Sequence, residues 1–309
     1  MANRIELLIE VATLYYEQNC TQTYIAKKLN ISRPTVASLL QEARDKGIVK
    51  ISIMKINKDT IDISNSIKEK YNIPNVFVSK EDTVYSKKEV GILCANYIES
   101  KKDTNIKIGV GFGSTVYEYV KSANYIKTNF KGLIPIMGGV ELNDEALHSN
   151  HLCYTLSRKY SCNMRFFYAP VKAESLAQKK MLIDSHMVKS AIEEAKKVDL
   201  AIVGVGNPLN MSTYQKLHYI LDEDLDILEK NEAVGDIVTS LFNKDAEEII
   251  TPSSEKFIGL SIYDLKNIPE VVVLATGYQK SEAVKALISN KIVSTLIIDY
   301  ELANILISS

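Results

Sequence analysis

The sequence has no apolar run that approaches the roughly 18 residues needed to cross a bilayer. Its first residues lead into an amphipathic segment and do not have the form of a secretory signal peptide. Its four cysteines lie far apart, with no Cys-x-x-Cys pair, so neither a disulfide framework nor a zinc knuckle is indicated. We therefore expect a cytoplasmic protein without membrane spans or disulfides.

Motifs for nucleotides and metals are also missing. The glycine-rich segment 109–115 lacks the Lys-Ser/Thr pair of a Walker A motif, and no acidic residue about 20 positions further on supports a dinucleotide site. His148 and His151 have no adjacent carboxylate or cysteine, which disfavours a metal site. We expect no cofactor, no metal, and neither nucleotide hydrolysis nor NAD chemistry.

Length and charge indicate two domains. The chain has 309 residues, more than one domain usually holds, and 46% of them are hydrophobic, which is ordinary for a globular protein. Through Lys55 there are eight Lys/Arg and five Asp/Glu, a net charge of +3, which leaves −4 for the remainder. A basic amino-terminal segment followed by an acidic remainder fits a small DNA-binding module fused to a larger domain. We therefore expect domains at 1–54 and 55–309.

The amino-terminal module has the pattern of three helices. Residues 4–18 carry apolar side chains at helical spacing, which predicts that Ile5, Leu8, Ile9, Ala12 and Tyr16 form a buried face. Hydroxyl side chains precede two further helices, at 22–29 after Thr21 and at 33–44 after Ser32. An alternating segment at 48–53 predicts a strand, and hence a winged variant that brings Lys50 near DNA phosphates.

Two helices joined by a short turn place the second one where its first side chains can enter a major groove. The expected DNA contacts are small or base-capable residues on this pair of helices and a lysine after it: Thr21, Gln22, Arg33, Pro34, Thr35, Ser38, Gln41 and Lys46. The alternative is a plain three-helix bundle in which the same apolar pattern serves packing alone.

The remainder alternates between short apolar runs and helical segments. Strands are expected at 75–79, 106–110, 133–137, 200–205, 271–275 and 295–298, with helices at 87–100, 149–160, 184–196 and 280–289. Apolar runs without polar alternation, separated by helices, predict an α/β domain whose parallel sheet is covered on both faces.

Several of these strands end in glycines, where ligands of such sheets bind. The first loop, 109–115, leads into a helix that starts at Ser114 or Thr115, and backbone N–H groups at a helix start suit a phosphate. The same glycines could equally serve only a tight turn from strand to helix.

Residues 21–49 are similar to the helix-turn-helix of the SorC family of sugar-responsive transcriptional regulators, in the run Thr21-Gln22-x-x-Ile25-Ala26-x-x-Leu29-x-Ile31-Ser32-Arg33-Pro34-Thr35-Val36. The resemblance continues at 167–170, 199–206, 233–237 and 296–303 and so covers nearly the whole chain. It implies a winged helix-turn-helix followed by a Rossmann-like, sugar-phosphate isomerase-like domain that binds a phosphorylated sugar, in a homo-oligomer that is commonly a tetramer.

The resemblance also implies the effector contacts, which are Gly111, Gly113, Ser114, Thr115, Gly138, Gly139, Asp236 and Lys280. Lys280 could form an ion pair or an imine with the effector. Departures from the family pattern at Phe112, Ser114, Thr276 and Ala246 leave the identity of the sugar open.

We therefore expect a DNA-binding repressor of a carbohydrate-utilisation operon, with operator DNA and a phosphorylated sugar as partners. The alternative is a sugar-phosphate isomerase or deaminase-like enzyme, because fold does not decide function. Against an enzyme, no Asp/Glu–His or Asp/Glu–Lys cluster recurs in the glycine loops. A constitutive architectural DNA-binding protein would leave the large domain unexplained.

Overall fold

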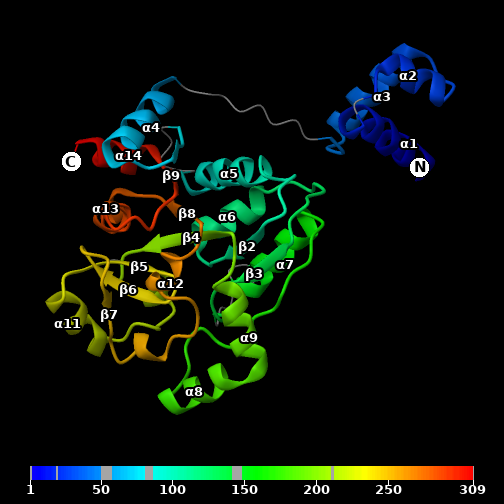
Figure 1. Ribbon diagram of the computed structural model, residues 1–309. Coiled ribbons are helices and arrows are strands. Elements are labelled where there is room, and N and C mark those ends of the chain that lie inside the picture. Colours follow the sequence, from blue (N-terminus) through cyan, green and yellow to red (C-terminus); the bar gives the residue numbers. More distant parts are fainter. Residues whose placement is uncertain are drawn as a thin grey trace. The chain divides into compact units, whose positions relative to one another are not determined.

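The computed structural model describes residues 2–18, 20–49, 58–80, 86–140, 148–209 and 212–308. The chain divides into two units, residues 1–56 and residues 57–309 (Figure 1). Across these described ranges, no helix is long and apolar enough to span a membrane.

Hydroxyl caps start the second and third helices of the first unit. The helical segments are α1 (Ala2–Ala12), a π-helical turn η1 (Thr13–Glu17), α2 (Gln22–Lys28) and α3 (Arg33–Asp45). Thr21 accepts a hydrogen bond from the backbone N–H of Tyr24, and Ser32 accepts one from that of Thr35, both at 3.2 Å. The two caps and the helix-turn-helix are those expected from the sequence.

The buried face of α1 differs from the expected one. Ile5, Ile9 and Tyr16 are 48%, 49% and 36% exposed, whereas Val11 and Leu14 are buried. The prediction assumed one regular helix through residue 18, but the chain widens into η1 after Ala12. Ile5 and Ile9 precede this turn, so the turn does not explain their exposure. The set Leu8, Val11 and Ala12 has the same helical spacing as the predicted set, and packing within the first unit decides which of the two faces is buried.

The strand expected at 48–53 lies mostly outside the described residues. Ile48 and Val49 form a bend after α3, and the N–H of Val49 donates to the carbonyl of Ala43 at 3.0 Å. Residues 50–53, including Lys50, are not described, so the wing strand stays a prediction.

The second unit contains a parallel sheet with the strand order β1–β9–β8–β4–β2–β3. Its strands are β1 (Asn75–Val78), β2 (Lys107–Val110), β3 (Gly132–Pro135), β4 (Leu200–Gly206), β8 (Glu270–Ala275) and β9 (Thr295–Ile298). All of them fall on the runs predicted from the sequence. Helices between the runs make parallel pairing possible, because parallel strands need long crossover connections.

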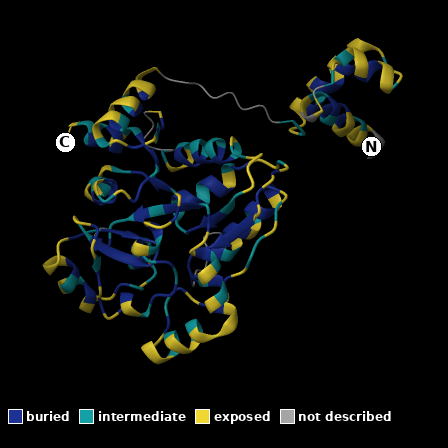
Figure 2. Ribbon diagram, in the orientation of Figure 1, coloured by how far each residue is buried: buried dark blue, intermediate teal, exposed yellow. Residues whose placement is uncertain are grey.

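Helices cover both faces of this sheet. One face packs on α5 (Ser86–Glu99), α6 (Ser114–Ser122) and α7 (Ser149–Lys159), and the other on α4 (Lys58–Tyr71), α9 (His186–Ala195), α13 (Ser281–Ser289) and α14 (Tyr300–Ser308). Along β4, Leu200 and Ile202 enter the first core, while Ala201 and Val203 enter the second. Figure 2 shows the strands buried between helices whose outer sides are exposed. This two-sided burial explains why the strands are apolar at every position.

An antiparallel extension of the sheet was not expected from the sequence. It consists of β5 (Ala233–Ile237), β6 (Ser240–Asn243) and β7 (Glu248–Ile249), and it joins β4 through the pair Val205 and Ile237. The turn between β5 and β6 is Val238-Thr239, with Val238 at φ +46°. A β-branched residue in that conformation is not a hairpin signal, so this hairpin depends on tertiary packing.

Short helices surround the extension and the ends of the sheet. They are α8 (Leu176–Asp184), α10 (Thr213–Lys216), α11 (Asp222–Lys230), α12 (Ile262–Leu265), η3 (Ser254–Lys256) and η4 (Tyr278–Lys280). The helix expected at 184–196 begins later, as α9, because Ser185 separates it from α8.

Candidate functional site

The candidate site lies where the direction of the chain through the sheet reverses. β2 leads to β3 on one side, whereas its other neighbour, β4, precedes β8 and β9 on the opposite side. The loops after β2 and β4 therefore diverge and leave a crevice at the carboxyl ends of these strands. Open α/β sheets bind their ligands at such a switch point.

A cavity of about 380 Å³ occupies this crevice. Six of the eight expected effector residues line it: Gly111, Gly113, Ser114, Thr115, Asp236 and Lys280. They come from the loop after β2, the start of α6, β5 and η4, so the structure brings together segments that are far apart in the chain. The volume is within the range of small-molecule sites.

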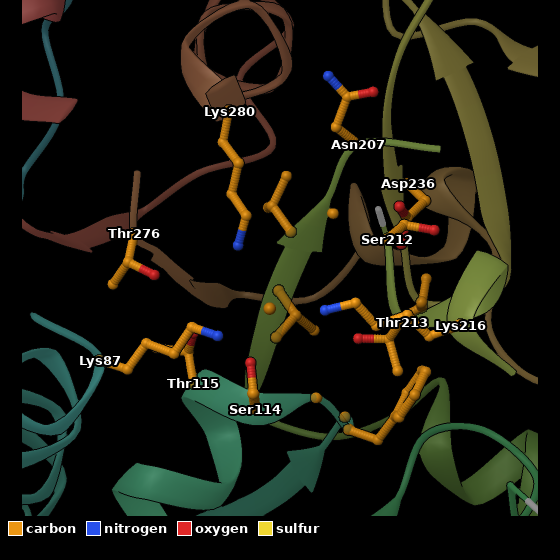
Figure 3. A pocket seen from close by; sticks show the side chains of 18 of the residues that line it. Lys87, Ser114, Thr115, Asn207, Ser212, Thr213, Lys216, Asp236, Thr276 and Lys280 are labelled. Atoms are coloured by element: carbon orange, nitrogen blue, oxygen red, sulfur yellow. The ribbon is translucent and has the colours of Figure 1, made fainter. Parts of the chain in front are cut away.

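The floor of the cavity is the amino-terminal end of α6. Gly113 precedes this helix at φ +122°, and no side chain in the described part of the chain caps the helix start. The first N–H groups of a helix have no intrahelical partner, and the helix dipole makes this end positive. Ser114 and Thr115 add hydroxyl groups beside these N–H groups (Figure 3). The arrangement suits an anion.

Three lysine side chains enter the cavity from three different elements. Lys87 comes from α5, Lys216 from α10 and Lys280 from η4, and their amino groups point into the space above α6 (Figure 3). Among the described residues, no carboxylate lies within ion-pair distance of any of the three. Unpaired ammonium groups that share one cavity repel one another until an anion joins them.

The pKa values of two of these lysines are lowered by burial and, to a smaller extent, by that repulsion. Burial, together with the charges of Lys87 and Lys216, lowers the pKa of Lys280 to about 8, against the opposing effect of Asp236. Burial and the charge of Lys216 also lower the pKa of Lys87. A bound anion would counter both effects by stabilising the charged ammonium groups.

Asp236 supplies the one buried carboxylate of the described cavity lining. Its Oδ2 atom is buried and has no hydrogen-bond partner among the described residues. Burial raises the pKa of Asp236 to about 7 against the opposing effect of the charge of Lys280. Gly206 permits this position, since a Cβ atom there would lie 2.1 Å from Oδ2. A ligand hydroxyl in the cavity could donate the missing hydrogen bond.

The pair of Asp236 and Lys280 corrects one expectation from the sequence. The glycine loops were expected to contain no acid and lysine in one cluster, yet Asp236 and Lys280 line the same cavity and interact electrostatically. Asp236 lies on β5 and Lys280 in η4, far apart in the chain, so spacing along the chain could not reveal the cluster.

Gly138 and Gly139 are not among the residues that line this cavity. The N–H of Gly138 donates to the carbonyl of Ile258 at 2.9 Å, and that of Gly139 donates to the carbonyl of Ala169 at 2.8 Å. A Cβ atom at Gly138 would lie 2.3 Å from the carbonyl oxygen of Pro170. Gly138 therefore permits close packing of two backbone segments, Gly139 leaves room for the side chain of His148, and the structure does not bring the pair to the lysine-lined cavity.

Sequence reasoning missed several polar residues of the cavity. They are Lys87, Asn207, Ser212, Thr213, Lys216 and Gln279. Asn207 follows a glycine-ended strand and could have been found by that signal. Lys87 and Lys216 stand in ordinary polar surroundings in the sequence, and only the topology brings them to the site.

The expected DNA-binding residues lie on one short stretch of the first unit. Arg33, Pro34, Thr35, Ser38, Gln41 and Lys46 are exposed, as is Thr21, while Gln22 is partly exposed. Gln41 donates to Asp45 at 2.8 Å, and Lys46 forms an ion pair with Glu42 at 3.0 Å. Arg33 makes no ion pair within the described residues, so its guanidinium is available to a base or a phosphate.

A helix-turn-helix unit joined to an α/β unit with a polar pocket defines a ligand-binding, DNA-binding protein. Comparison with known families agrees for both units. A winged helix-turn-helix DNA-binding model matches residues 11–50, and the sugar-binding domain model matches residues 56–308.

Relatives match over almost the full chain. A deoxyribonucleoside regulator from Bacillus subtilis is 27% identical over 98% of this chain and 97% of its own length. The sorbitol operon regulator from Klebsiella pneumoniae is 24% identical over 98% of both chains.

Solved structures agree with these relatives. A DeoR family transcriptional regulator from Listeria monocytogenes is 31% identical, with a TM-score of 0.75 over 81% of this chain and 100% of that one. The full-length sorbitol operon regulator SorC from Klebsiella pneumoniae has a TM-score of 0.75 at 23% identity over 99% of both chains, a likeness of fold. The chain belongs to the family of SorC-type sugar-binding transcriptional regulators.

Proposed function

We propose that this regulator represses a carbohydrate-utilisation operon and that a phosphorylated sugar, bound in the lysine-lined cavity, changes its affinity for operator DNA. Three unpaired lysines above the uncapped start of α6 are the observation that carries the proposal. A phosphate monoester has a charge of about −1.5 to −2 at neutral pH and three acceptor oxygens, so it matches several donors at once.

The rest of the cavity supports a sugar. The carboxylate of Asp236 lacks a donor, and the side chains of Asn207, Ser212 and Thr213 can bond hydroxyl groups. The names of two relatives refer to a deoxyribonucleoside and to sorbitol, which supports a sugar-derived effector. Operator half-sites are usually paired, so we propose that the protein acts as a homo-oligomer, a dimer or a tetramer.

A thermal-shift screen tests the effector. The protein is heated with glucose 6-phosphate, fructose 6-phosphate and ribose 5-phosphate, each beside its unphosphorylated parent sugar. A ligand at 100 times its Kd stabilises the native state by about 2.7 kcal/mol, which raises Tm by roughly 5–10 °C for a domain of this size. Stabilisation by a phosphorylated sugar and not by its parent is expected, whereas equal shifts for both would contradict a phosphate site.

Control of DNA binding is tested with a duplex that the protein selects from a random library. Fluorescence anisotropy measures the affinity for this duplex with and without the stabilising sugar phosphate. We expect the two affinities to differ, since an effector controls a regulator only by binding its two states differently. Identical affinities would contradict effector control while leaving DNA binding intact.

One observation favours a second candidate function, that of a sugar-phosphate isomerase. Asp236 has a pKa near 7 and shares the cavity with Lys280, and such a pair can move protons at a sugar carbon. An isomerase would interconvert glucose 6-phosphate and fructose 6-phosphate and incorporate deuterium from heavy water. We infer that the protein is not an enzyme, so NMR should detect neither change, and deuterium incorporation would favour the isomerase.

A further inference from the structure

One buried carboxylate joins the effector-binding loop to the last helix of the chain. Asp299 Oδ2 accepts a hydrogen bond from the N–H of Gly277 at 2.8 Å, and Oδ1 accepts one from the N–H of Leu302 at 3.1 Å. Gly277 leads directly into η4, which presents Lys280 to the cavity. Leu302 lies in the first turn of α14, so Asp299 connects the loop and the helix through its two oxygens.

The other end of α14 is held by α4. Lys70 donates from its amino group to the carbonyl oxygens of Leu306 and Ile307, at 3.1 and 2.8 Å. The hydroxyl of Tyr71 donates to the carbonyl of Leu306 at 2.9 Å. These carbonyls belong to the last turn of α14 and have no partner within the helix. The carboxyl end of α4 therefore caps α14.

Space beside α14 would let this helix move. A second cavity, of about 590 Å³, lies between α14 and the effector loop and is lined by Thr276, Gly277, Gln279, Tyr300 and Asn304. It shares Lys87, Thr276 and Gln279 with the effector cavity. The start of α14 thus borders open space on the side of the effector, whereas its end is bonded to α4.

α4 is the first described element of the second unit, and the chain reaches it directly from the segment that follows the helix-turn-helix. A shift of α4 would act on the connection between the two units.

We infer that α14 couples the effector cavity to α4 and through it to the DNA-binding unit, with Asp299 as the contact to the effector loop and Lys70 and Tyr71 as the contacts to α4. The inference rests on the proposed control of operator affinity by a sugar phosphate. An anion on Lys280 draws η4 toward the cavity, Gly277 and Asp299 follow, and α14 carries the displacement to α4. Effector and DNA must then influence each other equally.

The test uses the full-length variant Lys70→Met/Tyr71→Phe. Lys70 is exposed and Tyr71 is half-buried, so the hydrogen bonds to α14 are lost without a large cavity in the core. Lys68→Met is the matched control, because it removes the same charge from α4 at a side chain that makes none of these hydrogen bonds. The probe is whichever of the three sugar phosphates above raises Tm most.

Three quantities are measured for each protein: the affinity for the probe, the affinity for the selected duplex without the probe, and the duplex affinity with the probe. We expect the first two to change less than about twofold in the double variant. The ratio of the two duplex affinities should fall toward 1, by roughly threefold to tenfold, as expected for the loss of hydrogen bonds that act between coupled sites. The control should keep the wild-type ratio.

The other possible results distinguish a failure of the coupling through α14 from a failure of the proposed function. If the wild-type protein responds to the probe and the double variant responds equally, the coupling through α14 is wrong and the proposed function stands. If the wild type binds the probe without a change in duplex affinity, the proposed function fails, and the inference with it. Loss of probe binding in the double variant would also overturn the inference, because the contacts would then shape the cavity.

Hydrogen exchange gives a second measurement that needs no DNA. The probe should change the exchange rates of backbone amides in α4 of the wild type, and this change should be absent in Lys70→Met/Tyr71→Phe, which keeps the aromatic ring at position 71. Equal changes in the two proteins would contradict the coupling.

Discussion

At the scale of single residues, the cavity contains charged side chains that lack their usual ion-pair or hydrogen-bond partners among the described residues. Lys87, Lys216 and Lys280 have no carboxylate at ion-pair distance among the described residues, and the Oδ2 atom of Asp236 has no donor. Buried groups of this kind cost stability unless a ligand satisfies them. The protein retains these unsatisfied groups where a ligand can join them, and two predictions follow from their charges.

Replacing Lys216 with methionine should weaken binding of the stabilising sugar phosphate. A hydrogen bond to a charged group contributes about 1.5–3 kcal/mol, so the affinity should fall roughly tenfold to hundredfold in isothermal titration calorimetry. Lys230→Met, at an exposed lysine of α11 outside the cavity, is the control. Equal affinity in the two variants would show that α10 does not contribute to the binding site.

Asp236→Asn should stabilise the ligand-free protein at neutral pH and above. The pKa of Asp236 is raised from 3.8 to about 7, so between these values the folded state holds a proton that the unfolded state has lost. The free energy of unfolding therefore decreases as pH rises from 4 to 7. Above pH 7 the titration of Asp236 does not lower it further. The variant should have a higher Tm than the wild type at pH 8, by an amount that corresponds to at least about 1 kcal/mol.

The same comparison at pH 4 should show little difference, because the carboxyl is then protonated in the folded wild type. A gain in Tm that is equal at pH 4 and pH 8 would show that Asp236 is not a destabilising charge.

At the scale of elements, the first unit follows from local rules. Ser32 caps α3, Pro34 occupies its first turn, and Val36, Leu39 and Leu40 bury one face, which leaves the opposite face to solvent. Each of these features depends on near neighbours in the chain, which is why the sequence predicts them. The buried face of α1 was predicted less well, because Val11 and Ile9 both stand at helical spacing to neighbouring apolar residues, and only packing against the other helices chooses between the two faces.

Arg33→Ala should weaken binding to the selected duplex and leave the affinity for the sugar phosphate unchanged. An arginine that contacts a base edge contributes about 1–3 kcal/mol of discrimination, which is roughly fivefold to 150-fold in affinity. The control is Arg158→Ala, at an exposed arginine of α7. Fluorescence anisotropy measures the affinity for the selected duplex and for a scrambled one. An equal loss of affinity for both would show that Arg33 contacts a phosphate and not a base.

The antiparallel hairpin of β5 and β6 shows the limit of element prediction. Gly235 and Asp236 interrupt its apolar pattern, and its turn contains Val238 in a left-handed conformation. Its stability comes from long-range packing, since Ile237 and Phe242 enter the core shared with the parallel sheet. Because this hairpin places Asp236 in the cavity, missing it also concealed the acid–lysine pair.

At the scale of the whole molecule, each unit has a hydrophobic core of its own. Leu8, Val36 and Leu39 belong to a core confined to the first unit, and the cores that flank the sheet contain residues of the second unit alone. Each unit therefore has the packed interior that a separately folding domain needs.

A fragment of residues 57–309 should therefore fold and keep its thermal shift with the sugar phosphate, while losing affinity for the duplex. In the full-length protein, higher salt should weaken duplex binding steeply, because counterions released from DNA phosphates drive that association. Calorimetry and anisotropy on both proteins test this division. A fragment that folds but fails to bind the sugar phosphate would show that the effector site needs the first unit.

The sequence by itself determined the helix-turn-helix, the parallel strands and the glycine loops, because caps, apolar periodicity and strand-end glycines act over a few residues. Only the tertiary structure decided which polar groups meet. Lys87, Lys216 and Asp236 reach one cavity because the strand order brings their elements together, and Gly138 packs elsewhere because another backbone segment occupies its N–H. The coupling through Asp299 likewise joins segments that no local pattern relates, since contacts between distant elements depend on topology.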